Sequence, residues 1–321
     1  MLDRVTPAVR AALGRLSHLP VVGTVILRGR ARLEDREQQA VARRPMTRVV
    51  DDLRDRTGSP EPDGPAPVFV LAAGWRSGST LVQRLVMSSG DVFLWGEPFD
   101  RSSPISTLTA QARPMRRDWP PREWLIDPDS PPADRLVNDW IATLSPPLER
   151  LADAHRAYLT TLLRPPATFT GSRWGAKEVR LSGEDAVWLS HLYPAASFVF
   201  VVRNPWDAYA SYKGIRRWYH RWPDAMVSSV AQYATLWNDL AASFLAVSEE
   251  VNGTLLRHED LSDPDRLDEL DAFLGAPVDR AVLGTRRPGP DVWRPRRLSR
   301  WDSWQIDHIA GETATRLGYG D

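Results

Sequence analysis

The stretch VFVLAAGWRSGSTLVQRLVM, residues 68–87, carries the clearest structural signal in this sequence of 321 residues. It begins with an apolar run of strand length, which predicts a strand buried on both faces. Small residues from Gly74 to Ser79 predict a loop, and the apolar spacing from Thr80 to Met87 predicts a helix. This order of strand, loop and helix is typical of a parallel sheet flanked by helices.

The same pattern recurs further along the chain. It predicts an α/β fold with three layers, in which a parallel sheet lies between helices. The predicted strands are Val92–Trp95, Phe198–Val202 and Gly253–Arg257, and the predicted helices begin at Trp206 and at Asp263, with the second ending at Leu274.

The chain is predicted to consist of an N-terminal arm, residues 1–60, and a domain, residues 61–321. The arm is rich in arginine, with an excess of roughly five positive charges, and a Pro/Gly-rich linker follows it. Two arrangements of the arm are open: an amphipathic helix packed on its own domain, or weak contact with an anionic membrane surface. The domain contains an insertion rich in Pro, Arg and Trp at about 101–170.

Composition excludes several classes of protein. The 41 Lys+Arg balance 41 Asp+Glu, so the chain lacks the surplus of cations with which proteins coat nucleic acid. There are no cysteines, which excludes disulfides, thiolate ligands and a cysteine nucleophile. The histidines lack metal-ligand spacing, and no apolar run reaches the ~20 residues of a membrane span. We expect a cytoplasmic protein without a metal site.

The loop from Gly74 to Thr80 predicts an anion site. Its glycines let backbone N–H groups turn towards an anion, and the helix N-terminus adds partial positive charge. Ser79 and Thr80 add hydroxyl donors, and Arg76 adds a cation. The spacing and the lysine of a Walker A loop are missing. We therefore predict that this loop binds phosphate without being a Walker A loop.

A second motif follows the predicted strand Phe198–Val202. Arg203 stands at the carboxyl end of that strand, where open α/β sheets bind ligands. Ser211 follows about two helical turns later. A guanidinium and a hydroxyl together suit a second phosphate. Because Arg-x-Pro after a strand is also common in capped loops, this prediction depends on its pairing with the first motif.

Together these motifs resemble those of sulfotransferases that use 3′-phosphoadenylyl sulfate (PAPS). Arg76–Thr80 is similar to their 5′-phosphosulfate loop, and Phe198–Ser211 to their 3′-phosphate motif. The resemblance covers roughly residues 67–320 and implies a P-loop-like sulfotransferase fold. Segments similar to the carbohydrate and tyrosylprotein branch are Gly96–Pro98, Trp174–Arg180, Arg257–Leu261 and Leu317–Tyr319.

The resemblance also implies a reaction and a set of binding residues. PAPS would be the donor, adenosine 3′,5′-bisphosphate the product, and the acceptor a hydroxyl of a carbohydrate, glycolipid or small metabolite. Arg286 and Arg287 loosely match the basic loop that covers the 3′-phosphate in this family. The residues expected to bind the cofactor are Trp75, Arg76, Ser77, Gly78, Ser79, Thr80, Arg203, Ser211, Arg286 and Arg287.

Sulfuryl transfer increases the negative charge on the leaving phosphate oxygen, so the protein must supply positioning and cations. Arg76 is one such cation. Lysine occurs only at Lys177 and Lys213, and a compact ammonium fits a single bridging oxygen better than a planar guanidinium does. We therefore predict Lys177 as the second cation. Lys213 is expected to face solvent from a helix or to contact a phosphate peripherally.

The acceptor hydroxyl must lose its proton. Glu97 is the predicted general base, because the matching glutamate of the related branch points at the acceptor. His155 is the alternative, since the small-phenol branch of the family uses a histidine. Glu178 and Arg180 would share one face of a strand and form an ion pair or a secondary acceptor contact.

Two other functions remain open at the level of the sequence. A nucleotide-dependent phosphotransferase would need a loop lysine, which is absent. A non-catalytic nucleotide-binding scaffold of the same fold would tolerate the loss of Glu97 and Lys177, and both residues are present.

Overall fold

The structure is a computed structural model that describes residues 39–60, 66–126, 141–214, 220–221, 226–284 and 295–320. Most of the predicted arm, as well as Arg286 and Arg287, lies outside these residues. The chain divides into one unit of residues 1–45 and a second that starts at Met46. Helix α3 (Met46–Thr57) belongs to the second unit because its apolar stripe is buried and it packs against helix α8. The described part of the predicted arm thus includes a helix that belongs to the second unit.

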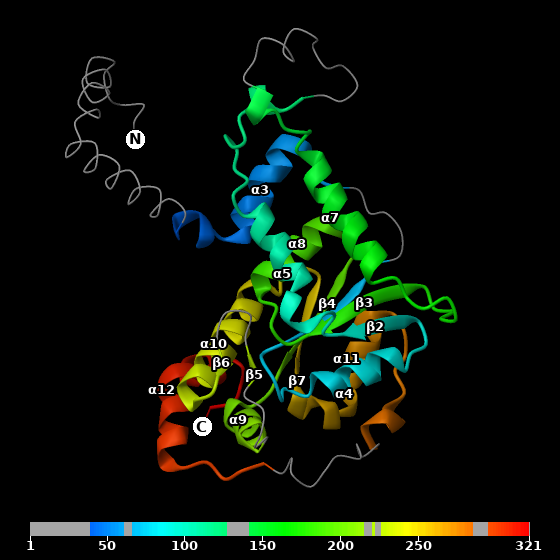
Figure 1. Cartoon of the computed structure of the whole chain (residues 1–321). Coiled ribbons are helices and arrows are strands. Elements are labelled where there is room, and N and C mark those ends of the chain that lie inside the picture. Colours follow the sequence, from blue (N-terminus) through cyan, green and yellow to red (C-terminus); the bar gives the residue numbers. More distant parts are fainter. Residues whose placement is uncertain are drawn as a thin grey trace, which may run out of the picture. The chain divides into compact units, whose positions relative to one another are not determined.

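Five parallel strands form the central sheet of the second unit, in the order β2-β3-β1-β4-β7 (Figure 1). Strands β1 and β4 are buried along their whole length, as their continuous apolar runs predict. The strands are β1 (Val68–Ala72), β2 (Val92–Gly96), β3 (Arg173–Glu178), β4 (Ser197–Val202) and β7 (Gly253–Arg257). A separate antiparallel pair consists of β5 (His220–Arg221) and β6 (Met226–Val227).

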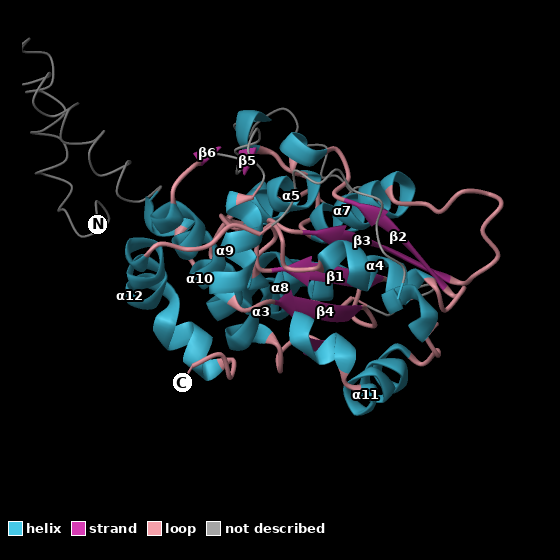
Figure 2. Cartoon of the chain, turned by 90° about the horizontal axis from the view of Figure 1, so that it is seen from below, coloured by secondary structure: helices cyan, strands magenta, loops and turns pink. Residues whose placement is uncertain are grey.

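Helices cover both faces of this sheet, which confirms the predicted α/β fold. Helices α4 and α11 lie on one side and α3 and α8 on the other (Figures 1 and 2). Helix α10 packs against α8, α9 and α12, and the predicted insertion contains α5 and α7, which pack against α8. The bounds are α4 (Ser79–Met87), α5 (Pro104–Ala112), α7 (Glu149–Leu162), α8 (Gly183–Leu192), α9 (Pro205–Lys213), α10 (Val230–Val247), α11 (Pro264–Leu274) and α12 (Arg300–Arg316).

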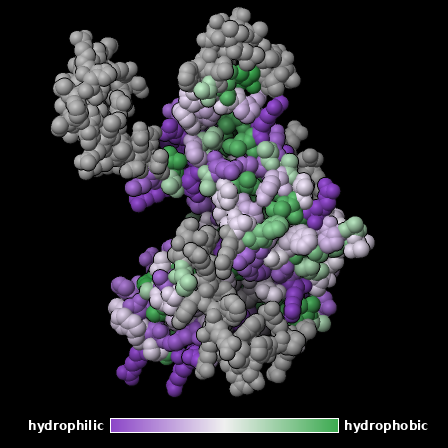
Figure 3. Space-filling model, in the orientation of Figure 1, coloured by the Kyte–Doolittle hydropathy of each residue, from purple (hydrophilic) through white to green (hydrophobic). Residues whose placement is uncertain are grey.

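The core consists of apolar side chains between the sheet and these helices, with Phe69, Phe198, Trp188 and Trp237 among its largest members. On the face shown in Figure 3, hydrophobic residues are interspersed with hydrophilic ones, as is usual for a protein surface. None of the helices within the described ranges is long and apolar enough to cross a membrane.

Because all five strands of the main sheet run in the same direction, their carboxyl ends meet at one edge. The loop from Gly74 follows β1, Glu97 follows β2, and Lys177 lies near the end of β3. Arg203 follows β4 and His258 follows β7. This edge is where open α/β sheets bind ligands, and it collects most of the predicted site residues.

Candidate functional site

The loop between β1 and α4 is shaped by left-handed residues. Gly78 has a φ of +88° and occupies the N-cap position of α4. A Cβ at this position would overlap the imidazole of His258, so Gly78 combines an unusual backbone conformation with a close approach. The hydroxyl of Ser77 is buried and donates to the carbonyl of Gly74 at 3.0 Å. Ser77 thus stabilises the loop from inside.

Arg76 connects this loop to the second motif. It is not a glycine, yet its φ is +70°, a strained conformation of the kind that clusters at functional sites. Its Nε donates to Ser211 Oγ at 2.9 Å, and its carbonyl accepts from Arg203 Nη1 at 3.1 Å. Two motifs that are far apart in the sequence are therefore in direct contact.

A cavity of about 290 Å³ lies at this contact. The N-terminal residues of α4 form one side of it, and three arginines in its lining make it rich in positive charge. Such a cavity suits a phosphate or sulfate group. The lining residues are Arg76, Gly78, Ser79, Thr80, Leu81, Arg84, Arg203, His258 and Leu283.

A second, larger cavity of about 610 Å³ adjoins the first. The two cavities share Leu81, His258 and Leu283. Leu261 and Leu267 add further apolar surface to the second cavity. A cationic cavity that adjoins an apolar one fits a ligand with phosphate groups and a flat, weakly polar ring system.

Glu97 and Lys177 form an ion pair at the ends of β2 and β3. The side chain of Lys177 is buried. The backbone carbonyl of Lys177 accepts a hydrogen bond from the backbone N–H of Glu97 at 2.8 Å. The φ of Glu97 is +45°, and Phe99, Asp100 and Ser103 also have positive φ angles. Four strained residues in such a short segment are costly to stability and indicate a functional constraint on this segment.

Arg180 holds this strained segment from the side of β3. Its buried guanidinium donates to Asp100 Oδ1 at 2.5 Å and lies 4.0 Å from Glu97 Oε2. It also lies 3.6 Å from Glu178 Oε2, so the predicted ion pair is present. The strand ends at Glu178, however, so Arg180 does not share a strand face with it. Burial raises the pKa of Glu178 to about 7, although Arg180 opposes this shift.

Some residues predicted to bind the cofactor lie behind the cavity and do not line it. The indole of Trp75 is buried and stacks on Tyr212, with ring centroids 6.2 Å apart. The carbonyl of Trp75 accepts from Tyr233 Oη at 2.6 Å. Ser77 and Ser211 are also absent from the lining. These residues hold Arg76 and its loop in place.

The alternative base, His155, lies in the core of the insertion. It is buried in α7, its Nε2 is 3.1 Å from Gln111 Oε1, and its ring meets Trp188 edge to face. Burial lowers the pKa of His155. It lines neither of the two cavities, which favours a packing role.

Lys213 has a carboxylate partner that the sequence does not indicate. Its ammonium group is half-buried and lies 2.5 Å from Asp302 Oδ2. Asp302 belongs to the capping box at the start of α12, where it also accepts from the N–H and the hydroxyl of Ser299. Lys213 therefore joins α9 to α12 and is not among the residues that line the cavity.

Two polar residues of the cavity, His258 and Arg84, were not among the predicted site residues. Burial, and next the nearby Arg203, lower the pKa of His258. Its buried Nδ1 has no hydrogen-bond partner among the described residues. The signal that indicates His258 is its place directly after the strand Gly253–Arg257; for Arg84 it is a position one helical turn beyond Thr80.

A family model described as the sulfotransferase family matches residues 67–271. No curated protein sequence matches the chain.

Solved structures give remote similarities. The sulfotransferase domain of the olefin synthase from Synechococcus PCC 7002 is 19% identical with a TM-score of 0.41, over 80% of this chain and 97% of that one. A sulfotransferase from Alicyclobacillus acidocaldarius is 16% identical with a TM-score of 0.41, over 80% of this chain and 97% of that one. The sulfotransferase STF9 from Mycobacterium avium is 16% identical with a TM-score of 0.42, over 90% of this chain and 85% of that one.

Proposed function

The chain belongs to the sulfotransferase family, and we propose that it transfers the sulfuryl group of PAPS to a hydroxyl of a carbohydrate, a glycolipid or another small hydroxylated metabolite. One observation carries this proposal: Arg76 and Arg203 line the same cavity and are joined through the carbonyl of Arg76. A donor with phosphate groups at two positions needs two such cations close together.

The residues of the two cavities fit this donor. Ser79, Thr80 and the N-terminus of α4 suit the phosphosulfate, while Arg203 suits the 3′-phosphate. The adjoining apolar cavity, which Leu261 and Leu267 help to form, suits the purine. The donor supplies an activated sulfuryl group, and the protein supplies its orientation.

Proton transfer is assigned to Glu97. As the acceptor oxygen bonds to sulfur and the bond from sulfur to the phosphate oxygen breaks, the hydroxyl proton passes to the carboxylate of Glu97. Lys177 and Arg76 stabilise the charge that remains on the phosphate oxygen. Lys177 is already held at the carboxyl end of the sheet by its ion pair with Glu97.

The proposal is tested by titration calorimetry with adenosine 3′,5′-bisphosphate and with adenosine 5′-monophosphate. We expect clear preference for the bisphosphate, because only this nucleotide occupies both cationic positions. Equal affinity for the two nucleotides, or no binding of either, contradicts the proposal. Labelled PAPS incubated with a panel of hydroxylated acceptors then identifies the acceptor class.

A further inference from the structure

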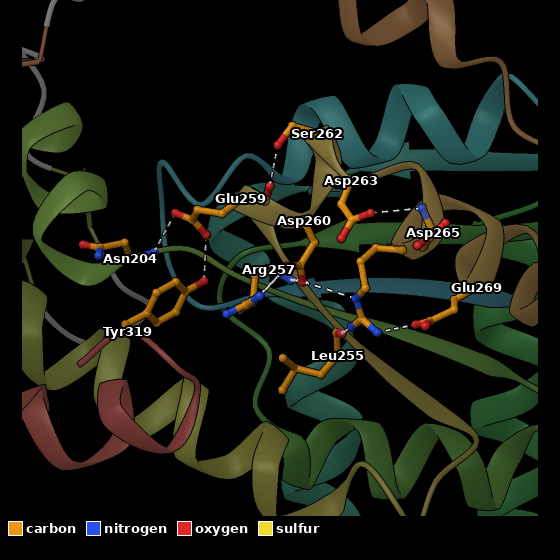
Figure 4. Close-up of polar contacts among 11 residues, drawn as sticks. Asn204, Leu255, Arg257, Glu259, Asp260, Ser262, Asp263, Asp265, Glu269 and Tyr319 are labelled. Carbon is orange, nitrogen blue, oxygen red and sulfur yellow. Dashed lines mark hydrogen bonds and ion pairs between the residues drawn. The ribbon is translucent and has the colours of Figure 1, made fainter. Parts of the chain in front are cut away.

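The segment that follows α12 reaches back to the edge of the sheet that holds the site. Figure 4 shows Glu259 between Tyr319 and Asn204. Its Oε2 accepts from Tyr319 Oη at 2.9 Å, and its Oε1 accepts from the backbone N–H of Asn204 at 3.2 Å. Asn204 directly follows Arg203, and Glu259 directly follows His258. Arg203 and His258, which line the cavity, are therefore each adjacent in sequence to a residue that takes part in these hydrogen bonds.

The position of Tyr319 follows from the way α12 ends. Gly318 has a φ of +79°, its N–H donates to Thr315 O at 2.9 Å, and the N–H of Tyr319 donates to Ala314 O at 2.9 Å. These bonds form a Schellman motif, which stops the helix and reverses the chain. The motif fixes the backbone from which the tyrosine ring extends towards Glu259.

The turn after β7 is fixed from its other side as well. The guanidinium of Arg257 donates twice to the buried carboxylate of Asp260, at 2.9 and 2.7 Å, and lies 6.0 Å from the centre of the Tyr319 ring (Figure 4). Both bonds end on the same oxygen, Oδ1, and they are charge-assisted, which makes them stronger than hydrogen bonds between neutral groups. The short segment from Arg257 to Asp260 is thus held at both ends, with His258 and Glu259 in between.

We propose that Tyr319 is a positioning residue for the donor site, acting through Glu259 on the loop that carries Arg203. This inference rests on the proposed function, because it takes the cavity of Arg203 and His258 to be the site of the nucleotide phosphate. The hydroxyl of Tyr319 holds the Glu259 carboxylate on the N–H of Asn204. A carboxylate released from this position would be free to pair with Arg203 and to compete with the phosphate for it.

The matched experiment compares Tyr319→Phe with Tyr158→Phe. Tyr158 is 47% exposed on α7 and lines neither cavity, so its variant controls for the loss of a tyrosine hydroxyl. Two measurements are made on the full chain: hydrogen exchange of the segment 203–209 without ligand, and calorimetric titration with adenosine 3′,5′-bisphosphate and adenosine 5′-monophosphate. Glu259→Gln serves as a second variant that breaks the same chain of contacts.

For Tyr319→Phe we expect faster exchange in the segment 203–209 and bisphosphate binding weaker by about fivefold, the loss typical of one hydrogen bond. The affinity for adenosine 5′-monophosphate should change less, so the preference between the nucleotides falls. If Tyr319 had a merely structural role, the variant would bind both nucleotides more weakly by the same factor. Glu259→Gln should behave like Tyr319→Phe, and Tyr158→Phe like the unchanged protein.

Unchanged exchange in the segment 203–209 of Tyr319→Phe overturns the inference, and so does faster exchange with an unchanged preference between the nucleotides. If the unchanged protein binds neither nucleotide, the proposed function fails. In that case the exchange measurement still decides whether Tyr319 holds the loop of Arg203.

Discussion

Arg76 Nε lies 2.9 Å from Ser211 Oγ, although 135 positions separate the two residues in the sequence. This bond fixes the direction of the Arg76 side chain at the rim of the cavity. The guanidinium is therefore oriented before a ligand arrives, and pre-orientation lowers the entropic cost of binding.

Replacement of Ser211 by alanine should weaken binding of adenosine 3′,5′-bisphosphate by about fivefold, because Arg76 loses the hydrogen bond from its Nε to Ser211 Oγ. Titration calorimetry measures the change. The control is Ser190→Ala, since the Ser190 hydroxyl donates to Val187 O within its own helix, at 2.9 Å, and Ser190 does not line the cationic cavity. Equal affinities of both variants would show that the contact between Arg76 and Ser211 does not contribute to binding.

Replacement of Glu97 by glutamine should lower turnover by about 10²–10⁴-fold, because the amide cannot accept the hydroxyl proton. The affinity for adenosine 3′,5′-bisphosphate should stay close to normal, since Glu97 does not line the cationic cavity. Glu149→Gln, at an exposed position of α7, is the control in both assays. Full activity of the Glu97→Gln variant would show that another group is the base, and His155→Gln would be the next variant to assay.

Replacement of Lys177 by alanine or by arginine should slow transfer, by about 10²-fold for alanine, as expected for the loss of one group that stabilises the developing charge. Arginine retains the charge, but its planar group is wider than an ammonium, and the site is buried. The only other lysine provides a matched control: Lys213→Arg should keep the full rate, because an arginine can still pair with Asp302. Full activity of Lys177→Arg would refute the explanation from the shape of the ammonium group.

The affinity for adenosine 3′,5′-bisphosphate should depend on the ionisation of His258. Burial and the charge of Arg203 lower the pKa of His258 in the free protein, whereas a bound phosphate raises it by favouring the imidazolium. Binding therefore takes up a proton. The affinity is highest at a pH below the pKa that His258 has in the free protein. It falls as the pH rises through the pKa that His258 has in the complex.

Calorimetry in buffers with different ionisation enthalpies measures this proton uptake directly. His258→Gln should flatten the pH dependence of the affinity, while the exposed His308→Gln should leave it unchanged. A pH dependence that survives in His258→Gln would assign the proton to another group.

The parts of the fold that depend on local patterns could be predicted from the sequence. The strand Val68–Ala72 and its glycine-rich loop were predicted because a buried parallel strand leaves an unbroken apolar run. Strand β3, with the sequence RWGAKE, carries three charged residues and leaves no such run. Its place between β2 and β1 depends on contacts between distant segments, which a local pattern does not contain.

The same distinction applies to the site. Arg76 and Arg203 could be predicted because each follows a recognisable strand, and the structure places both at one cavity. The burial of Trp75 against Tyr212 could not be predicted, since a loop sequence does not show which of its side chains point inward. His258 has neither metal-ligand spacing nor a motif of its own, and only its position directly after the strand Gly253–Arg257 indicates a place at the site.

The order of the strands also has a consequence for how such a protein can diversify. The loop after β1 stands in the middle of the edge; β4 and β7 provide Arg203 and His258 on one side, while β3 and β2 provide Lys177 and Glu97 on the other. Under the proposed function, nucleotide binding and removal of the acceptor proton would occupy opposite halves of one sheet. Recombination that exchanges the segments around β2 and β3 can introduce a new acceptor preference while the nucleotide half is inherited intact.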